Sequence, residues 1–316
     1  MPPLLERLGV ELPVVQAGMG GGLSRHELAA AVSEAGGLGT IAVNGAGAIR
    51  RELAAARTLT GRPLAVNVLL PFARRDWFEA AAAADVVVTF WGRPRRRTGR
   101  AWLHQCGSVE EARRARVAGA DGVIVQGVEA GGHVRGTTPA LQLLEEARRV
   151  LPADYPVWVA GGIADRGDVR SATEAGAEAA VAGTRFILSE ESRAHALYKE
   201  RLLESRETVL TELFGAGWPA PHRVVPNAAT EHWGEPPPLT RLLNHLLAPG
   251  ARYAPPSLQT RMVQAQRPGS RLLLPAGPTD DAPSTLVDAG ALYAGETVAR
   301  IEEVAPASDL VRQLTP

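Results

Sequence analysis

The sequence predicts an α/β protein built as a (β/α)8 barrel, followed by a small, mainly helical C-terminal appendage. Eight short apolar runs of four to seven residues alternate with helical segments, and they lack the period-two alternation of half-buried strands. Three helical segments end in Ala-Gly before the next apolar run, at 35–38, 118–121 and 175–178, where glycine suits the left-handed end of a helix. This repeated unit favours a barrel over a doubly wound sheet of the flavodoxin type, which needs only five strands.

Composition limits the classes of protein to which the chain can belong. It has 316 residues, 45% hydrophobic residues and no net charge at pH 7, which favours neither nucleic acid nor an anionic membrane as a partner. Its single cysteine, Cys106, excludes a disulfide framework and suits a reducing compartment. No apolar run reaches the roughly 18 residues of a membrane span, and the N-terminus lacks the features of a signal peptide. We therefore expect a cytoplasmic protein.

Strands and helices alternate through residues 1–205, which form the predicted barrel domain. Strands are expected at 13–17, 38–43, 64–70, 86–90, 102–106, 122–126, 157–160 and 179–182. Helices are expected at 25–34, 49–60, 74–84, 108–118, 138–150 and 168–175. Ser24 with Glu27, and Ser108 with Glu111, have the spacing of a capping box, so each serine is expected to cap the helix that follows it.

The connection between the fourth and fifth strands is unusually short. Residues 91–100 (WGRPRRRTGR) contain Pro94 and two glycines that oppose a helix, whereas a parallel crossover normally needs a dozen residues or so. Either this crossover is a tight loop, or one of the two strands is misplaced. Its five arginines are interpreted as a solvated surface loop or, alternatively, as an anion site: Arg93, Arg95, Arg96, Arg97 and Arg100.

Residues 206–316 have a different pattern and form the predicted appendage. Prolines divide this part of the chain into short pieces, with helices expected at 239–247, 257–265 and 293–303. Residues 266–285 are rich in proline and glycine and are expected to form a loop. We expect the appendage to pack beside or over the mouth of the barrel.

A glycine-rich segment after the sixth strand carries the candidate catalytic residue. Residues 122–136 read GVIVQGVEAGGHVRG, so that a buried strand delivers Gln126, Glu129 and His133 into a loop. Active sites of α/β proteins lie at the carboxyl ends of parallel strands. An imidazole, with a usual pKa near 6.5, can take a proton from a carbon acid at neutral pH. His133 is therefore the candidate base; the alternative is a tight turn that carries a surface histidine.

The ends of other strands supply candidate cofactor-binding groups. Glycine turns after the seventh and eighth strands expose backbone amides that suit a phosphate, and Thr184 adds a hydroxyl. The side-chain amides of Asn67 and Gln126 suit the edge of a flavin ring, which carries donors and acceptors. The glycines of 18–22 let the backbone approach a flat ring. The alternatives are ordinary tight turns and, for Asn67, a satisfied polar group in the core.

Several other chemistries are disfavoured. Lys199, the only lysine, lies in a charged helical pattern that does not suit a Schiff-base enzyme. The histidines lack metal-ligand spacing, so no metal site is expected. The GMGGG segment at 18–22 does not match the dinucleotide-binding fingerprint. Cys106 is interpreted as a small buried residue rather than a nucleophile.

Five segments together resemble the nitronate monooxygenase family, formerly called 2-nitropropane dioxygenases. Bacterial flavin-dependent enoyl-acyl-carrier-protein reductases share the same motifs. The segments are VQAGMGGGLSRHELAAAVSEAGGLGTIA, LAVNVLL around Asn67, VIVQGVEAGGHVRG, VAGGIADRGDVRSATEAGAEAAVAGTRF and YAGETVARI. The resemblance implies an FMN-bound TIM barrel with His133 as base. It implies FMN contacts from Asn67, Gln126, Gly131, Gly161, Gly162, Gly183 and Thr184, with the turn of Ala17, Gly18 and Met19 beneath the flavin.

The resemblance also implies a reaction. A nitronate, or a nitroalkane after loss of a proton, gives an electron to FMN, and reduced flavin passes electrons to O2, so that a carbonyl compound and nitrite are the products. Two alternatives stay open: an FMN- and NAD(P)H-dependent enoyl-thioester reductase, and a flavin-binding pathway protein without turnover. The expected partners are a small-molecule substrate and O2, with no nucleic acid and no membrane, and a homodimer is left open.

Overall fold

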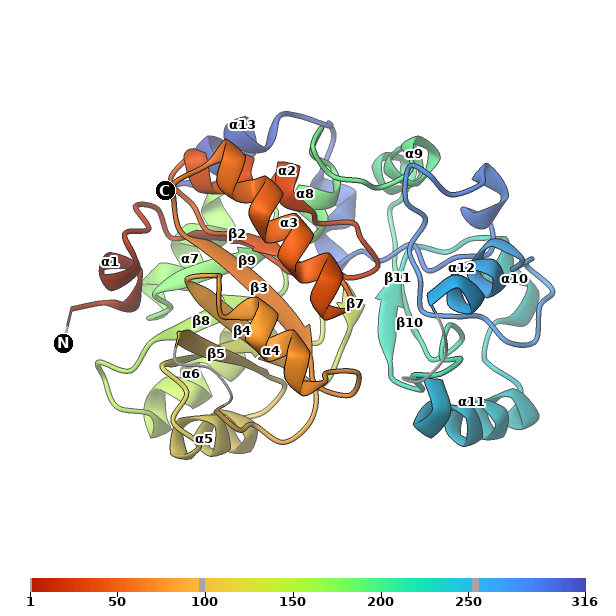
Figure 1. The fold of residues 1–316 in the computed structure, drawn as a ribbon, viewed down its shortest axis with the longest axis horizontal. Coiled ribbons are helices and arrows are strands. Elements are labelled where there is room, and N and C mark those ends of the chain that lie inside the picture. Colours follow the sequence, from red (N-terminus) through yellow and green to blue (C-terminus); the bar gives the residue numbers. More distant parts are fainter. Residues whose placement is uncertain (1, 97–99, 252–255) are drawn as a thin grey trace.

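Eight parallel strands form a closed barrel, as the sequence predicts (Figure 1). The structure is a computed structural model that describes residues 2–96, 100–251 and 256–316. The strand order is β1-β9-β8-β6-β5-β4-β3-β2, and a parallel bridge between Val15 of β1 and Leu38, the residue before β2, closes the barrel. The fold is a (β/α)8 TIM barrel. Its strands are β1 Val14–Gln16, β2 Gly39–Ile41, β3 Leu64–Leu69, β4 Val86–Phe90, β5 Ala101–Cys106, β6 Gly122–Gln126, β8 Val157–Ala160 and β9 Ala179–Ala182.

Helices cover the outside of the barrel, and the predicted ones lie within a few residues of their expected bounds. They are α2 His26–Glu34, α3 Ala46–Leu59, α4 Arg75–Ala81, α5 Val109–Val117, α6 Ala140–Val150, α7 Arg166–Glu174 and α8 Thr184–Ile187. Their apolar faces pack on strands whose side chains are almost fully buried on both faces of the sheet. This two-sided burial explains why the strands read as continuous apolar runs.

The inside of the barrel is filled by side chains, and its amino-terminal end is closed. Trp158 of β8 is fully buried in the interior, and its Nε1 donates a hydrogen bond to Glu178 at 3.1 Å. The other carboxylate oxygen of Glu178 accepts from the backbone N–H of Leu5 at 2.8 Å. Leu5 belongs to α1, Leu4–Leu8, a short helix that the sequence did not predict. Because this end is closed, the opposite end of the barrel is left for a site.

Residues 91–96 and 100, the described part of the unusual crossover, contain no helix, and both flanking strands lie within one residue of their expected bounds. β4 and β5 pair in parallel with Val86 opposite Ala101. Arg96 donates to Gly119 O and Asp121, and Arg100 donates to Ala82 O. These two arginines therefore tie the crossover to neighbouring connections at the amino-terminal end of the strands. Arg97 lies outside the described residues.

The two expected helix caps have different outcomes. Ser108 caps α5, because its side chain accepts a hydrogen bond from Glu111 N. The prediction for Ser24 is wrong: Arg25 is the N-cap residue of α2, and the Ser24 hydroxyl bonds to Met19 in the preceding turn. The glycines before Ser24 fold the chain back onto this hydroxyl, so the side chain is no longer available to the helix.

The appendage contains both helices and strands. A three-stranded antiparallel sheet joins β10 Val209–Thr211 and β11 His222–Val224 to β7 Gly132–His133, the two-residue strand in the loop after β6. The helices expected at 239–247 and 257–265 are present as α11 Pro238–Ala251 and α12 Pro256–Gln264. The remaining elements are α9 Ala196–Glu204, α10 Ala228–Trp233, η1 Ser284–Leu286, η2 Glu296–Arg300 and α13 Ala307–Leu314.

The helix expected at 293–303 is wrong. Only Glu296–Arg300 is helical, as a 3-10 turn, because Tyr293 forms an antiparallel bridge with Val224 and Ala294 N donates to Arg223 O. The last helix, α13, returns to the barrel and packs against α2, α7 and α8.

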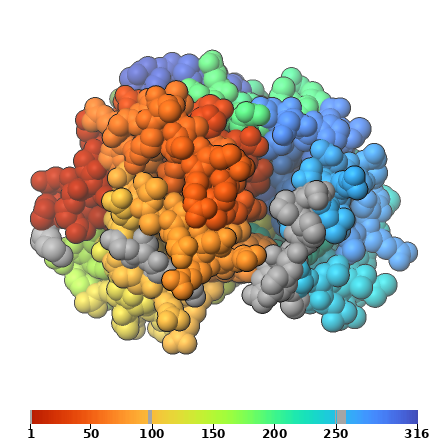
Figure 2. Space-filling model, viewed as in Figure 1, coloured from red at the N-terminus to blue at the C-terminus, as the bar shows by residue number. Residues whose placement is uncertain are grey.

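The division between barrel and appendage at residue 205 stays a prediction. Barrel and appendage lie side by side (Figure 2). None of the helices in the described ranges combines the length and apolar character that a membrane span requires.

Candidate active site

One large cavity opens at the carboxyl ends of the strands, between the barrel and the appendage. Its volume is about 1190 Å³. Barrel turns line one side, and residues of α11, α12 and the segment 272–282 line the other. The structure places all eleven candidate residues around it: Ala17, Gly18, Met19, Asn67, Gln126, Gly131, His133, Gly161, Gly162, Gly183 and Thr184.

The loop that carries His133 is shaped by Gln126 and Glu129. Gln126 is almost fully buried, and its Nε2 donates to His133 O at 3.0 Å while its Oε1 accepts from Arg135 N at 3.4 Å. The Glu129 carboxylate accepts from Ala140 N at 2.9 Å and so caps the first turn of α6. The two polar residues that precede His133 thus hold the loop and the next helix in place.

His133, a residue that lines this cavity, has a ring nitrogen without a hydrogen-bond partner. Its Nε2 is buried and has no hydrogen-bond partner. The imidazole stacks on the indole of Trp218, with ring centroids 3.7 Å apart and planes at 18°. The rings of His222 and Tyr293 lie 5.3 and 5.7 Å away. Burial, and next the neighbouring His222, hold the pKa of His133 well below its usual value. At neutral pH the ring is therefore uncharged and can accept a proton.

His222 keeps its own ring neutral and in one tautomer. Its Nε2 accepts a hydrogen bond from Phe214 N at 3.3 Å, so the proton resides on Nδ1, which lies 2.9 Å from Ala220 O. Burial lowers the pKa of His222 to about 4. Because β11 pairs with β7, this residue lies directly opposite His133.

Close backbone approaches surround the rest of the cavity. A Cβ atom on Gly18 would lie 2.4 Å from Asn67 Cβ, and one on Gly131 would lie 2.6 Å from Ala294 C. Asn67 Nδ2 donates to Gly18 O at 3.2 Å, whereas its Oδ1 is buried without a partner. Larger residues at these two glycines would therefore displace the groups beside them.

The turns after β8 and β9 line the cavity with glycines and Thr184. Gly161 and Gly162 have φ of 115° and 74°, a region that favours glycine. The Thr184 hydroxyl accepts a hydrogen bond from Gly295 N at 2.9 Å and can still donate its own proton. Thr184 therefore ties the first residue of α8 to the C-terminal segment.

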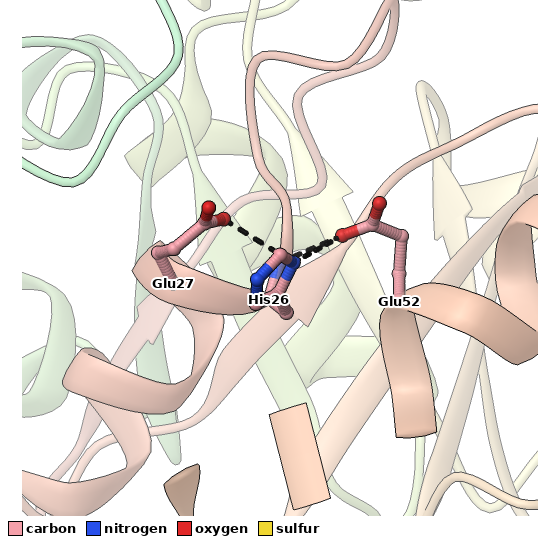
Figure 3. Close-up of side chains that lie close together, drawn as sticks. All are labelled: His26, Glu27 and Glu52. Atoms are coloured by element: carbon pink, nitrogen blue, oxygen red, sulfur yellow. Dashed lines mark hydrogen bonds and ion pairs between the residues drawn. The ribbon is translucent and has the colours of Figure 1, made fainter. Parts of the chain in front are cut away.

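A polar cluster lies where α2 meets α3, and one member, Glu52, also lines the cavity. Among the described residues, one group of three possible metal ligands brings its ligand atoms within 4.8 Å of one another: His26, Glu27 and Glu52. Figure 3 shows the His26 ring between the two carboxylates, with Nδ1 2.6 Å from Glu52 and 3.3 Å from Glu27. Glu52 also accepts from the backbone N–H of His26 at 3.1 Å. It thus replaces the missing N-cap side chain of α2, and this structural role accounts for the cluster.

The family of the chain follows from comparison with known proteins. A family model described as nitronate monooxygenase matches residues 2–104 and 84–316.

The chain belongs to the nitronate monooxygenase family.

Two curated proteins illustrate its relationships. A nitronate monooxygenase of Pseudomonas aeruginosa is 36% identical over 268 residues, an alignment that covers 65% of this chain and 74% of that protein. A (3aS,4S,5R,7aS)-5-hydroxy-7a-methyl-1-oxo-octahydro-1H-indene-4-carboxyl-CoA dehydrogenase of Mycobacterium tuberculosis is 32% identical over 244 residues. That second alignment covers 71% of this chain and 65% of the mycobacterial protein, slightly less than two thirds of its length.

Solved structures agree over nearly the whole chain. FabK from Thermotoga maritima superposes with a TM-score of 0.77 at 27% identity, covering 98% of this chain and 94% of FabK. A nitroalkane oxidase from Streptomyces ansochromogenes gives a TM-score of 0.76 at 31% identity, covering 98% of this chain and 96% of the oxidase. This member of the nitronate monooxygenase family is an oxidoreductase.

The site residues that the appendage contributes were not identified from the sequence. Trp218, His222 and Tyr293 surround His133, yet all three lie in irregular segments or a three-residue strand without hydrophobic periodicity. The one available signal was a tryptophan between a glycine-rich and a proline-rich stretch. Cys106 is fully buried, and burial raises the pKa of its thiol, in agreement with the prediction of a structural cysteine.

Proposed function

We propose that the protein uses FMN to oxidise alkyl nitronates and nitroalkanes with O2 to a carbonyl compound and nitrite, with His133 as the base. The observation that carries this proposal is the buried Nε2 of His133, which has no partner and belongs to a residue lining the large cavity. An unpaired buried nitrogen is costly unless a ligand completes it. A neutral imidazole at such a position can accept the proton of a carbon acid.

The cavity fits FMN on two further grounds. Asn67 Oδ1 is a second buried atom without a partner, and it suits an N–H at the edge of the flavin ring. The volume of about 1190 Å³ exceeds the ~300–1000 Å³ of ordinary small-ligand sites and leaves room for ring, phosphate and substrate. Bound FMN supplies an electron acceptor for the nitronate and an electron donor for O2.

The residues proposed to hold FMN divide into three groups. Asn67, Gln126 and Gly131 would hold the edge of the ring. Amides and hydroxyl at the turns after β8 and β9 would hold the phosphate, from Gly161, Gly162, Gly183 and Thr184. The turn of Ala17, Gly18 and Met19 would lie beneath the ring, where the absence of a side chain on Gly18 lets the backbone pack against Asn67.

His133 would act on the substrate carbon. Its lowered pKa keeps the ring unprotonated through neutral pH, so the base is available without prior loss of a proton. The hydrogen bond from Gln126 to the His133 carbonyl fixes the backbone that carries the ring. A preformed nitronate has already lost its α-proton and does not need this step.

The first experiment asks whether the protein carries a flavin and releases nitrite. We expect the purified protein to show flavin absorption, and the flavin released by heat to have the mass of FMN. We expect nitrite release and O2 uptake with alkyl nitronates. A colourless protein that cannot be reconstituted, or a flavoprotein without turnover of nitronates, would contradict the proposal.

The second experiment tests the base. We expect His133→Ala to keep FMN and to lower kcat/KM for neutral nitroalkanes by about 10²–10⁴-fold, the range for loss of a general base. Oxidation of preformed nitronates should fall far less. His232→Ala, at an exposed residue of α10 outside the cavity, is the matched control and should leave both activities unchanged. Equal losses on both substrates would exclude the base role.

A second candidate function is an FMN- and NAD(P)H-dependent enoyl-thioester reductase. It is favoured by the outer part of the cavity, where Leu247, Met262 and Leu272 add apolar lining beyond the space a small nitronate needs. It predicts oxidation of NAD(P)H that depends on an enoyl thioester. Turnover of nitronates in the absence of NAD(P)H would favour the first function instead.

A further inference from the structure

Trp218 is the appendage residue in closest ring contact with His133. Its indole lies parallel to the imidazole at 3.7 Å and covers one face of it. Both residues line the large cavity. A flat ring held against another flat ring has a fixed plane, so the direction in which Nε2 points depends on this contact.

The indole is itself held by two loops of the barrel. Phe72, after β3, and Trp91, after β4, meet Trp218 edge to face at centroid distances of 5.3 and 5.4 Å. Trp91 adopts a φ of 56°, a strained conformation for a bulky residue. The guanidinium of Arg135 lies over the Trp91 ring at 4.8 Å. Strain of this kind persists where the surroundings require a particular side-chain position, here one that supports Trp218.

We propose that Trp218 is the positioning residue for His133: it fixes the plane of the imidazole, aims Nε2 at the substrate and excludes water from the covered face. His133 on the barrel loop and Trp218 from the appendage thus form one unit. The claim that Trp218 aims Nε2 at the substrate rests on the proposed function. The claim that Trp218 fixes the plane of the imidazole can be tested in the protein without any substrate.

The stack has two opposing effects on the charge of His133. Exclusion of water disfavours the imidazolium and lowers the pKa by up to about 3–5 pH units in a fully buried site. The π-face of an indole favours the cation, but this effect is worth only about one pH unit. Removal of Trp218 should therefore raise the pKa of His133.

Other titratable or charged groups also face or adjoin His133. They are His222, Arg223, Tyr293, Glu296 and Arg135 with its partner Glu111.

The structural test is NMR of the protein with ¹³C-labelled histidine. We expect an upfield ring-current shift of the His133 signals in the wild type, which Trp218→Ala abolishes and Trp218→Phe partly keeps. We expect the pKa of His133, followed by the same signals, to rise in Trp218→Ala by at least one pH unit. Trp233→Phe, on α10 and outside the cavity, is the matched control. An unchanged shift and pKa in Trp218→Ala would overturn the proposal.

The catalytic test separates positioning from binding. We expect Trp218→Ala to lower kcat/KM for a neutral nitroalkane by about 10- to 100-fold, the scale for a base displaced by about 1 Å. Oxidation of the preformed nitronate should change less than about threefold, and Trp218→Phe should restore much of the loss. Equal losses on both substrates would overturn the positioning role. If the wild type oxidises neither substrate, the proposed function is contradicted. The NMR result then tests by itself whether Trp218 fixes the plane of the His133 imidazole.

Discussion

At the scale of single residues, the site depends on glycines, which let neighbouring segments pack closely, as much as on residues with side chains. Gly131 and Gly20 both line the cavity, but their surroundings differ. A Cβ on Gly131 would lie 2.6 Å from the backbone of Ala294 and Gly295, whereas one on Gly20 would meet nothing within 4 Å. The loop that carries His133 is therefore packed directly against the C-terminal segment at Gly131.

We expect Gly131→Ala to destabilise the protein by about 1–3 kcal/mol, the usual cost of overpacking against a backbone that must move, and to weaken FMN retention. Gly61→Ala, outside the cavity and with nothing within 4 Å of an added Cβ, is the matched control and should leave both nearly unchanged. Urea unfolding followed by fluorescence, and the flavin content of the purified variants, measure the two effects. Equal free energies of unfolding and equal flavin contents in the two variants would show that the packing at Gly131 contributes neither to stability nor to FMN retention.

The individual residues of the site differ in how far the sequence predicts them. Residues at strand ends were found because parallel strands in a barrel bring their carboxyl ends together, a rule that needs no side-chain detail. The hydrogen bonds of Gln126 to the His133 loop could not be predicted, because they depend on where β7 turns. Trp218 and His222 could not be predicted, because only the paired strands β7 and β11 bring the appendage to His133.

At the scale of elements, strands with two buried faces were the most predictable part of the fold. The bounds of β4, β6, β8 and β9 agree with the sequence prediction to the residue. Strands of two or three residues, such as β7 and β11, are too short to show any periodicity, and α13 was missed inside an irregular segment. Their positions are determined by long-range packing, which local sequence does not encode.

β5 contains a polar residue whose burial has a measurable consequence. His104 is almost fully buried, and its Nδ1 lies 2.8 Å from the Thr89 hydroxyl on β4. Burial, and next Arg135, lower its pKa to about 4. Between pH 6.5 and 4 the unfolded chain therefore binds more protons at His104 than the folded protein does, and the free energy of unfolding falls as the pH falls through this window.

We expect His104 to contribute a loss of about 2 kcal/mol in the free energy of unfolding between pH 7.5 and pH 5. His104→Asn keeps a polar atom near the Thr89 hydroxyl but cannot titrate, so its stability should depend less on pH by about that amount. Urea unfolding of both proteins at the two pH values is the measurement. An identical pH dependence would mean that His104 is not held neutral by the fold.

At the scale of the whole molecule, barrel and appendage share one cavity, and the appendage also presents an apolar face of its own. Leu239, Leu242 and Leu246 of α11 are 56%, 55% and 67% exposed. Their spacing of three and four residues places them on one side of the helix. Exposed apolar patches of this kind often mark contacts between proteins. The homodimer that the sequence leaves open is thus expected to form through this face.

We expect the purified protein to be a dimer in light scattering, and the double substitution of Leu242→Glu and Leu246→Glu to make it a monomer, because charged side chains at the centre of an apolar contact lose their hydration without gaining a partner. Val117→Glu, at an isolated apolar residue on α5 that is 85% exposed, is the matched control and should leave the dimer intact. A monomeric wild type, or a dimer that survives the double substitution, would exclude α11 as the contact. Nitrite release by the double variant would show in addition whether one chain alone builds the complete site.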